Sequence, residues 1–260
     1  MLRTAFPQRS TTPVRPNAYM TPHDTKTAAA TEDPWAGSRR VVQVRPHLRR
    51  WLASQAVEGP SLEIGPGLRP TAAVATSYFV DRSDHALEAL AVRGGRTARA
   101  EGSLPFPDGF FGAVLAFEVL EHVEDDETLL AEIARVLRPG GLFVMSTPVH
   151  RAKWSELDDA CHHVRRDEPD QLFGKVKARG FEISGYSFDP SEAPWLTRLR
   201  ARVLRTNRSA ATACVQSVFF PLHAAYQRRF AQVRWTSPDV PVPSWADDLA
   251  LQARLTVGAA

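Results

Sequence analysis

The chain has 260 residues, a net charge of +3, and a composition that is 43% apolar and 23% charged. These values are typical of a globular protein and exclude a collagen-like, low-complexity or disulfide-rich chain. Two cysteines give neither a disulfide framework nor a zinc spacing, no apolar run reaches the ~20 residues that span a bilayer, and no secretory signal is apparent. We therefore expect a cytoplasmic protein.

The N-terminal part divides into two segments of different character. Residues 1–34 are rich in Thr, Pro and Ala without hydrophobic periodicity, and such a segment cannot bury enough apolar surface to offset its ordering entropy. We expect a disordered tail there. In residues 35–56, apolar side chains near helical spacing predict a helix that packs on the domain, with Pro46 in its first turn or at a break.

From residue 61 onward, short β-type runs alternate with amphipathic helical ones. This alternation predicts a doubly wound, mostly parallel sheet with helices on both faces. The predicted strands are 61–64, 77–80, 111–117, 142–146 and 181–183, and the predicted helices are 86–92, 128–137 and 172–178.

The first predicted strand runs into a turn that contains Gly65 and Gly67. Glycines let the backbone turn tightly and approach a ligand closely, and an open α/β sheet binds its ligand at the carboxyl ends of its strands. A purely structural turn explains the two glycines equally well. The residues 69–71 stand where the dinucleotide fingerprint needs a third glycine, which argues against a nicotinamide dehydrogenase.

Asp81 ends the second predicted strand. A carboxylate at this place can accept hydrogen bonds from both ribose hydroxyls of a nucleoside cofactor. The alternative is that Asp81 is the N-cap of the helix that follows.

Further motifs follow in order: Glu101-Gly102-Ser103, the run 111–123, Arg138-Pro139-Gly140-Gly141 and the strand 142–146. Together with the glycine turn and Asp81 they resemble the class I S-adenosylmethionine-dependent methyltransferases, specifically the type-11 group that includes quinone-biosynthesis enzymes. The resemblance runs from about residue 62 to about 183. It implies a Rossmann-like fold and an S-adenosylmethionine-binding domain over residues 35–190.

The resemblance implies methyl transfer to a small-molecule acceptor, at oxygen rather than nitrogen or carbon. Two alternatives are an inactive cofactor-binding scaffold or regulator, and a methyltransferase for a membrane-associated lipid or quinone. The implied cofactor-binding residues are Glu63, Gly65, Pro66, Gly67, Asp81, Arg82, Glu101, Gly102, Ser103, Phe117 and Glu118. Among these, Glu63 is expected to reach the methionyl amino group and Asp81 the ribose.

The segment 150–170 interrupts the alternation and is rich in polar side chains. The resemblance implies that it lies over the active site, where Asp158, Arg165 and Arg166, together with Trp154, would contact the acceptor. His163 is the first candidate for a general base and His122 the second. A solvated charged loop is the alternative.

A metal site is conceivable after the fourth predicted strand. If a helix opens there, Glu118, Glu121 and His122 share one face and resemble the ligands that some relatives use for a divalent cation. Many type-11 sequences carry a similar motif without a metal, so we expect none here.

Residues 191–260 are predicted to form a basic, mainly helical extension or cap. No Asp or Glu occurs from residue 193 to 238, yet eight arginines do. Such a stretch suits a cap over an acidic substrate or a peripheral contact with an anionic membrane. No motif supports a nucleic-acid partner.

Overall fold

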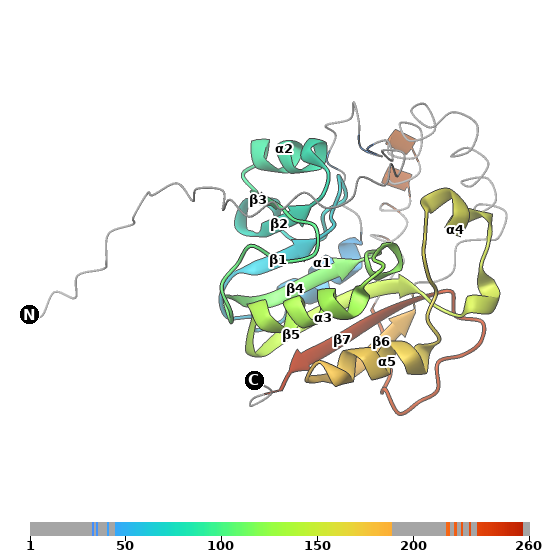
Figure 1. Ribbon diagram of the computed structural model, residues 1–260. Coiled ribbons are helices and arrows are strands. Elements are labelled where there is room, and N and C mark those ends of the chain that lie inside the picture. The colour runs from blue at the N-terminus through green and yellow to red at the C-terminus, as the bar shows by residue number, and fades with distance from the viewer. Residues whose placement is uncertain are drawn as a thin grey trace, which may run out of the picture. The chain divides into compact units, whose positions relative to one another are not determined.

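The computed structural model describes residues 45–188 and 233–256, and the isolated positions 33, 35, 41, 217–218, 221–222, 225 and 229. These residues build a seven-stranded sheet in the order β3-β2-β1-β4-β5-β7-β6 (Figure 1). The strands are β1 Ser61–Ile64, β2 Tyr78–Asp81, β3 Arg96–Arg99, β4 Phe111–Phe117, β5 Leu137–Pro148, β6 Phe181–Phe188 and β7 Asp248–Leu255. The α-helices are α1 Pro46–Ala53, α2 Asp84–Val92, α3 Asp126–Val136, α4 Glu156–Cys161 and α5 Pro169–Ala178.

Strands β1 to β5 pair in parallel, and β7 runs antiparallel between β5 and β6. The sheet grows outward from β1 in both directions, toward β2 on one side and toward β4 on the other. The carboxyl ends of β1 and β4 therefore form the switch point at which open α/β sheets bind their ligands. The predicted fold class, a Rossmann-like and mostly parallel sheet, is confirmed.

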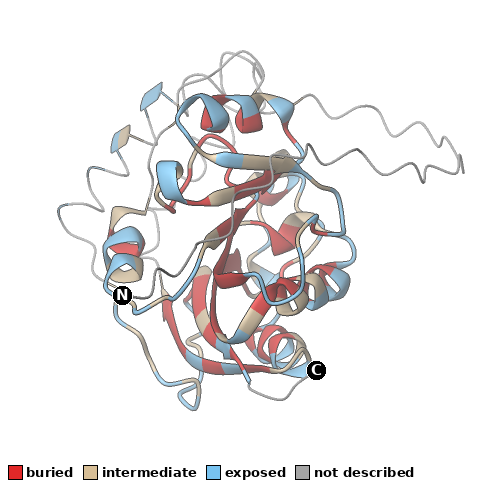
Figure 2. Ribbon diagram, turned by 90° about the vertical axis from the view of Figure 1, so that its left-hand side faces the viewer, coloured by how far each residue is buried: buried red, intermediate tan, exposed pale blue. Residues whose placement is uncertain are grey.

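Helices cover both faces of the sheet. On one face, α3 and α5 bury an apolar stripe that includes Leu130, Ile133 and Leu172 against the strands. On the other face, Leu48 of α1 and Leu90 of α2 pack on the central strands. Figure 2 shows the result, with buried residues concentrated in the strands and exposed ones on the outer sides of the helices. All seven residues of β4 are buried, as a central strand covered on both faces requires.

Local sequence signals explain where several helices begin. Asp125 caps α3, because its side chain accepts a hydrogen bond from the amide of Thr128 at 3.0 Å. Pro46 occupies the first turn of α1, where its missing amide hydrogen costs nothing. The helix predicted over residues 35–56 is shorter than expected, because Arg45, with φ of 53°, takes a left-handed conformation immediately before it.

Strand β7 lies near the end of residues 191–260, for which a mainly helical extension was predicted, so this part of the predicted extension is not helical. Leu249, Leu251, Ala253 and Leu255 are buried at alternate positions, and this period of two is the signature of a strand. Residues 189–216, which hold most of the arginines of the predicted cap, lie outside the described residues, as does nearly all of the predicted tail 1–34. None of the helices in the described ranges has the length and apolar character needed to cross a bilayer.

Removing residues 248–260 should abolish cooperative folding. Strand β7 supplies hydrogen bonds to both β5 and β6, so without it both neighbours expose an unpaired edge and a large part of the core. Urea denaturation followed by circular dichroism should show no sigmoidal transition. A chain that ends at residue 256 is the control and should unfold like the full chain. A cooperative transition in the shorter chain would contradict the interior position of β7.

Candidate functional site

Two buried carboxylates hold the glycine turn after β1. Gly65 and Gly67 have φ of 61° and 51°, which side chains rarely tolerate. Glu63 accepts hydrogen bonds from the amides of Thr71 and Ala72 at 2.9 and 2.7 Å. It is 1% exposed, and burial raises the pKa of its carboxyl group to about 7 although these amides lower it. Glu63 thus holds its own loop in place.

Asp81 lies at the end of β2 and faces the same turn. One carboxylate oxygen accepts from the amide of Gly67 at 2.8 Å and the other from the amide of Ser83 at 2.9 Å. The N-cap of α2 is Ser83, whose hydroxyl accepts from the amide of Ala86. Asp81 is therefore not the helix cap, and its carboxylate stays beside the glycine turn. Burial raises its pKa, and the nearby Asp33 adds to this effect.

A segment far from the turn in sequence covers Gly67. A Cβ atom on Gly67 would lie 2.1 Å from Cζ2 of Trp35, so the indole ring rests directly on the glycine. The guanidinium of Arg69 lies 5.3 Å from the Trp35 ring centroid. Asp33 anchors the segment, because it accepts from the Ser83 hydroxyl at 2.7 Å and from the Trp35 amide at 2.9 Å. This contact has no recognisable signal in the local sequence.

The other predicted cofactor residues lie at the ends of β1 to β3. Pro66 is buried in the glycine turn, whereas Arg82 is exposed after β2. Glu101 and Gly102 lie on the exposed loop after β3, where Glu101 pairs with Arg99 at 2.9 Å. Ser103, on the same loop, donates to Glu132 of α3 at 3.1 Å. These positions share the edge of the sheet that carries the glycine turn.

The chain bends sharply where β4 ends. Glu118 has φ of 55°, accepts a short hydrogen bond from the Ser146 hydroxyl, and lies 3.3 Å from the Arg45 guanidinium. The same guanidinium lies 5.1 Å from the ring centroid of Phe117. Burial opposes ionisation, but Arg45 and the Ser146 hydroxyl outweigh it and lower the pKa of Glu118. A fixed anion therefore stands at the carboxyl end of β4.

The segment after β4 corrects the expected arrangement of a helical face. Residues 120–122 form a single 3₁₀ turn (η2, Leu120–His122), so Glu118 does not share a face with Glu121 and His122. Glu121 is fully buried and accepts from the Thr147 hydroxyl at 3.1 Å. Burial and the neighbouring Glu118 raise the pKa of Glu121 well above its ordinary value.

Two histidines meet beside Glu121. The rings of His122 and His163 lie 4.8 Å apart and nearly perpendicular. Burial lowers the pKa of His122 to about 4. Burial also opposes protonation of His163, but Asp158 outweighs it and raises the pKa of His163 to about 10. With such a pKa, His163 carries its proton at neutral pH and cannot accept another, which weakens its role as the first candidate base.

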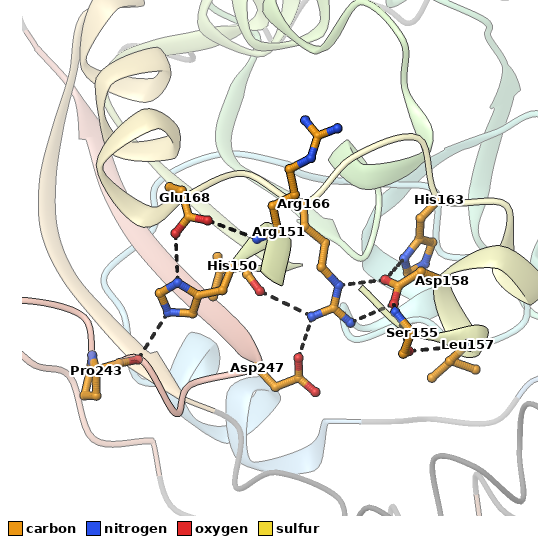
Figure 3. A network of polar contacts seen from close by, with 11 residues as sticks. His150, Arg151, Ser155, Leu157, Asp158, His163, Arg166, Glu168, Pro243 and Asp247 are labelled. Atoms are coloured by element: carbon orange, nitrogen blue, oxygen red, sulfur yellow. Dashed lines mark hydrogen bonds and ion pairs between the residues drawn. The ribbon is translucent and has the colours of Figure 1, made fainter. Parts of the chain in front are cut away.

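Asp158 is the centre of a buried polar network (Figure 3). Its carboxylate accepts two hydrogen bonds from Arg166 at 2.7 and 3.1 Å and one from Nδ1 of His163 at 2.9 Å. It also accepts from the amide of Ser155 and so completes the capping box of α4. The opposite side of the Arg166 guanidinium donates to Asp247, immediately before β7.

Arg165 and Trp154 do not join this network. Arg165 pairs with Asp126 of α3 at 2.6 Å, and the indole of Trp154 donates to Asp159 at 2.9 Å. The structure thus brings together Asp158, His163 and Arg166 and places the other two predicted acceptor residues elsewhere. Sequence reasoning missed Asp247 and Arg45. Asp247 could have been found only by recognising the alternating pattern of β7, which it precedes.

Replacing Arg166 with methionine should lower the free energy of unfolding by about 1.5–3 kcal/mol, because the buried negative charge of Asp158 would lose two charge-assisted hydrogen bonds and keep only His163 as a charged partner. The double variant Asp158→Asn/Arg166→Met should be less destabilised than Arg166→Met alone, since it removes that charge. Urea denaturation of the single and double variants measures both effects. A single variant within about 1 kcal/mol of wild type would show that the network is not a buried ion pair of this kind.

Comparison with known proteins agrees with this architecture. Residues 62–145 match the family model of the methyltransferase domain. A probable S-adenosylmethionine-dependent methyltransferase of Mycolicibacterium smegmatis is 37% identical over 83 residues, which are 31% of this chain and 32% of that protein. Norajmaline N-methyltransferase of Rauvolfia serpentina is 32% identical over 120 residues, 46% of this chain and 38% of that one. The matches therefore span only about a third of the length of these relatives.

A solved structure shows the same fold over a longer stretch. The putative methyltransferase of Bacillus halodurans superposes with a TM-score of 0.57 at 13% identity, over 81% of this chain and 98% of that one. At this identity the likeness concerns the fold alone. The family model and the motifs within it make the assignment: residues 62–145 form a methyltransferase domain of the type-11 group of class I S-adenosylmethionine-dependent methyltransferases.

Proposed function

We propose that the protein transfers a methyl group from S-adenosylmethionine to a small-molecule acceptor. The observation that carries this proposal is the glycine turn at the switch point, held by the Glu63 and Asp81 carboxylates. Gly65 and Gly67 have no Cβ atom, and the buried Asp81 ends the neighbouring strand β2. This combination fits a nucleoside cofactor. When bound, the cofactor supplies an electrophilic methyl group.

The turn and Asp81 would hold the cofactor in the following way. Gly65 and Gly67 would let it approach the main chain, and the Asp81 carboxylate would accept hydrogen bonds from the ribose. The Trp35 ring rests on Gly67. The cofactor can therefore approach Gly67 closely only if the Trp35 ring moves away from this glycine.

The acceptor would bind at the carboxyl ends of β4 and β5. Glu118, Glu121 and the two histidines lie there, next to the switch point and the glycine turn. Methyl transfer is an in-line displacement, so most of the rate enhancement can come from orienting the acceptor. We propose an oxygen acceptor, because the carboxylate of Glu118 and the neutral imidazole of His122 can accept the hydrogen bond of a hydroxyl group.

The substitution Asp81→Ala should weaken S-adenosylmethionine binding about 10- to 100-fold, the loss expected for charge-assisted hydrogen bonds. Isothermal titration calorimetry measures this change. Glu101→Ala, on the exposed loop after β3, is the matched control and should have a smaller effect, since its carboxylate already pairs with Arg99 in solvent. Unchanged affinity in a folded Asp81 variant would remove this residue from the cofactor site.

The acceptor atom can be determined with S-adenosylmethionine carrying a ¹³C-labelled methyl group. Incubation with matched phenols, amines and activated carbon acids, followed by NMR, identifies the atom from the chemical shift of the new methyl signal. We expect methylated oxygen. Transfer only to amines or carbon acids would overturn the oxygen preference, whereas the absence of transfer despite tight cofactor binding would favour the scaffold alternative.

A further inference from the structure

The carboxylate of Glu118 uses only one of its two oxygens in contacts with the protein. The Ser146 hydroxyl and the Arg45 guanidinium, the latter at 3.3 Å, both meet its Oε1 atom. Among the residues that the structure describes, none donates a hydrogen bond to its Oε2 atom. The side chain is 24% exposed, so a ligand can reach it. A carboxylate accepts at both oxygens, and Glu118 therefore keeps one of them available to a ligand.

The four buried acids of the site are engaged in other ways. Glu63 and Asp81 each accept hydrogen bonds from backbone amides with both oxygens. Both oxygens of Asp158 accept from a guanidinium. The raised pKa of Glu121 favours its neutral form. Glu118 thus differs from these four acids, because it combines a negative charge with an open oxygen.

The backbone holds Glu118 in an unusual conformation. Glu118 and its ion-pair partner Arg45 both have a left-handed φ, of 55° and 53°. Side chains rarely tolerate this conformation, which is found preferentially at ligand sites. The amide of Glu118 donates to the carbonyl of Ser146 at 2.9 Å, so β5 fixes the bend. The carboxylate is therefore directed by the backbone as well as by its two partners.

Glu118 lies next to the glycine turn. A Cβ atom on Gly65 would lie 2.9 Å from a Cγ2 atom of Val119, so the residue after Glu118 packs on that glycine. In the proposed function, Asp81 holds the ribose and the acceptor binds at the ends of β4 and β5. The cofactor's sulfur is joined to its ribose through a methylene carbon, and its methyl group must face the acceptor. The sulfur would therefore lie between these two groups, near the ends of β1 and β4.

We propose that the Glu118 carboxylate recognises the positive sulfonium of S-adenosylmethionine and so distinguishes it from S-adenosylhomocysteine, whose sulfur is neutral. This inference rests on the proposed function. Opposite charges attract more strongly at a partly buried site than in water. Methyl transfer removes the charge from the sulfur, so the carboxylate stabilises the bound cofactor more than the product and favours product release. The acceptor oxygen and the sulfur lie on opposite sides of the methyl carbon, so one carboxylate can face both.

The test is isothermal titration calorimetry of the full-length protein with S-adenosylmethionine and, separately, with S-adenosylhomocysteine. Glu118→Gln keeps the shape of the side chain and removes its charge. It should weaken S-adenosylmethionine binding about tenfold and change S-adenosylhomocysteine binding by less than about twofold. Glu118→Asp keeps the charge and should retain most of the preference. The matched control Glu121→Gln alters the nearby neutral carboxyl group and should preserve the ratio of the two affinities.

Arg45→Met provides a second variant with an effect of opposite sign. Without the guanidinium the Glu118 charge is less compensated, so the preference for S-adenosylmethionine should rise about threefold. This variant decides the question if thermal unfolding shows that Glu118→Gln does not fold, and an unchanged or lower preference would then overturn the inference. An unchanged affinity ratio in folded Glu118→Gln would overturn this inference alone. Failure of wild type to bind either ligand would overturn the proposed function as well.

Discussion

Hydrogen bonds from backbone amides to buried carboxylates determine the backbone geometry at the centre of this protein. The turn after β1 must adopt left-handed conformations at two glycines, and such a turn points amide hydrogens inward without partners from regular secondary structure. Asp81 accepts the amide hydrogen of Gly67, and Glu63 accepts those of Thr71 and Ala72 farther along the same loop. Because the two acids end neighbouring parallel strands, the sheet itself fixes the geometry of the turn. The ligand edge of the domain is built on this constraint.

A second buried acid organises the opposite side of the same edge. Asp158 joins the cap of α4, the Arg166 guanidinium and the His163 imidazole. Through Arg166, the segment is also tied to Asp247 and so to the start of β7. His163 is therefore held by a network that reaches the start of the C-terminal strand. This connection explains why a segment without regular alternation can present His163 in a defined orientation.

The two sides of the site differ in how they depend on chain segments remote in sequence. The glycine turn and Asp81 are nearly complete within β1 and β2, and only Asp33 and Trp35 come from elsewhere. The proposed acceptor side combines Arg45, which precedes α1, with Glu118 and Glu121 after β4 and with His163 and Arg166 from the 150–167 segment. Substrate-binding loops in this fold vary widely, so a fold-level likeness does not define the acceptor.

The sequence by itself determined the fold class, the order of most strands and helices, and the position of the glycine turn, because hydrophobic periodicity and glycine placement are local properties. It also located Asp158, His163 and Arg166 as a group. Only the tertiary structure decided that Arg165 pairs with Asp126 of α3. It also decided that His163, and not Glu118, lies beside Glu121 and His122. These outcomes depend on which side chain offers the better partner across long sequence separations. Strand β7 was missed because residues 191–260 were expected to be mainly helical, although its alternation is local. Its place between β5 and β6 is a property of the whole sheet.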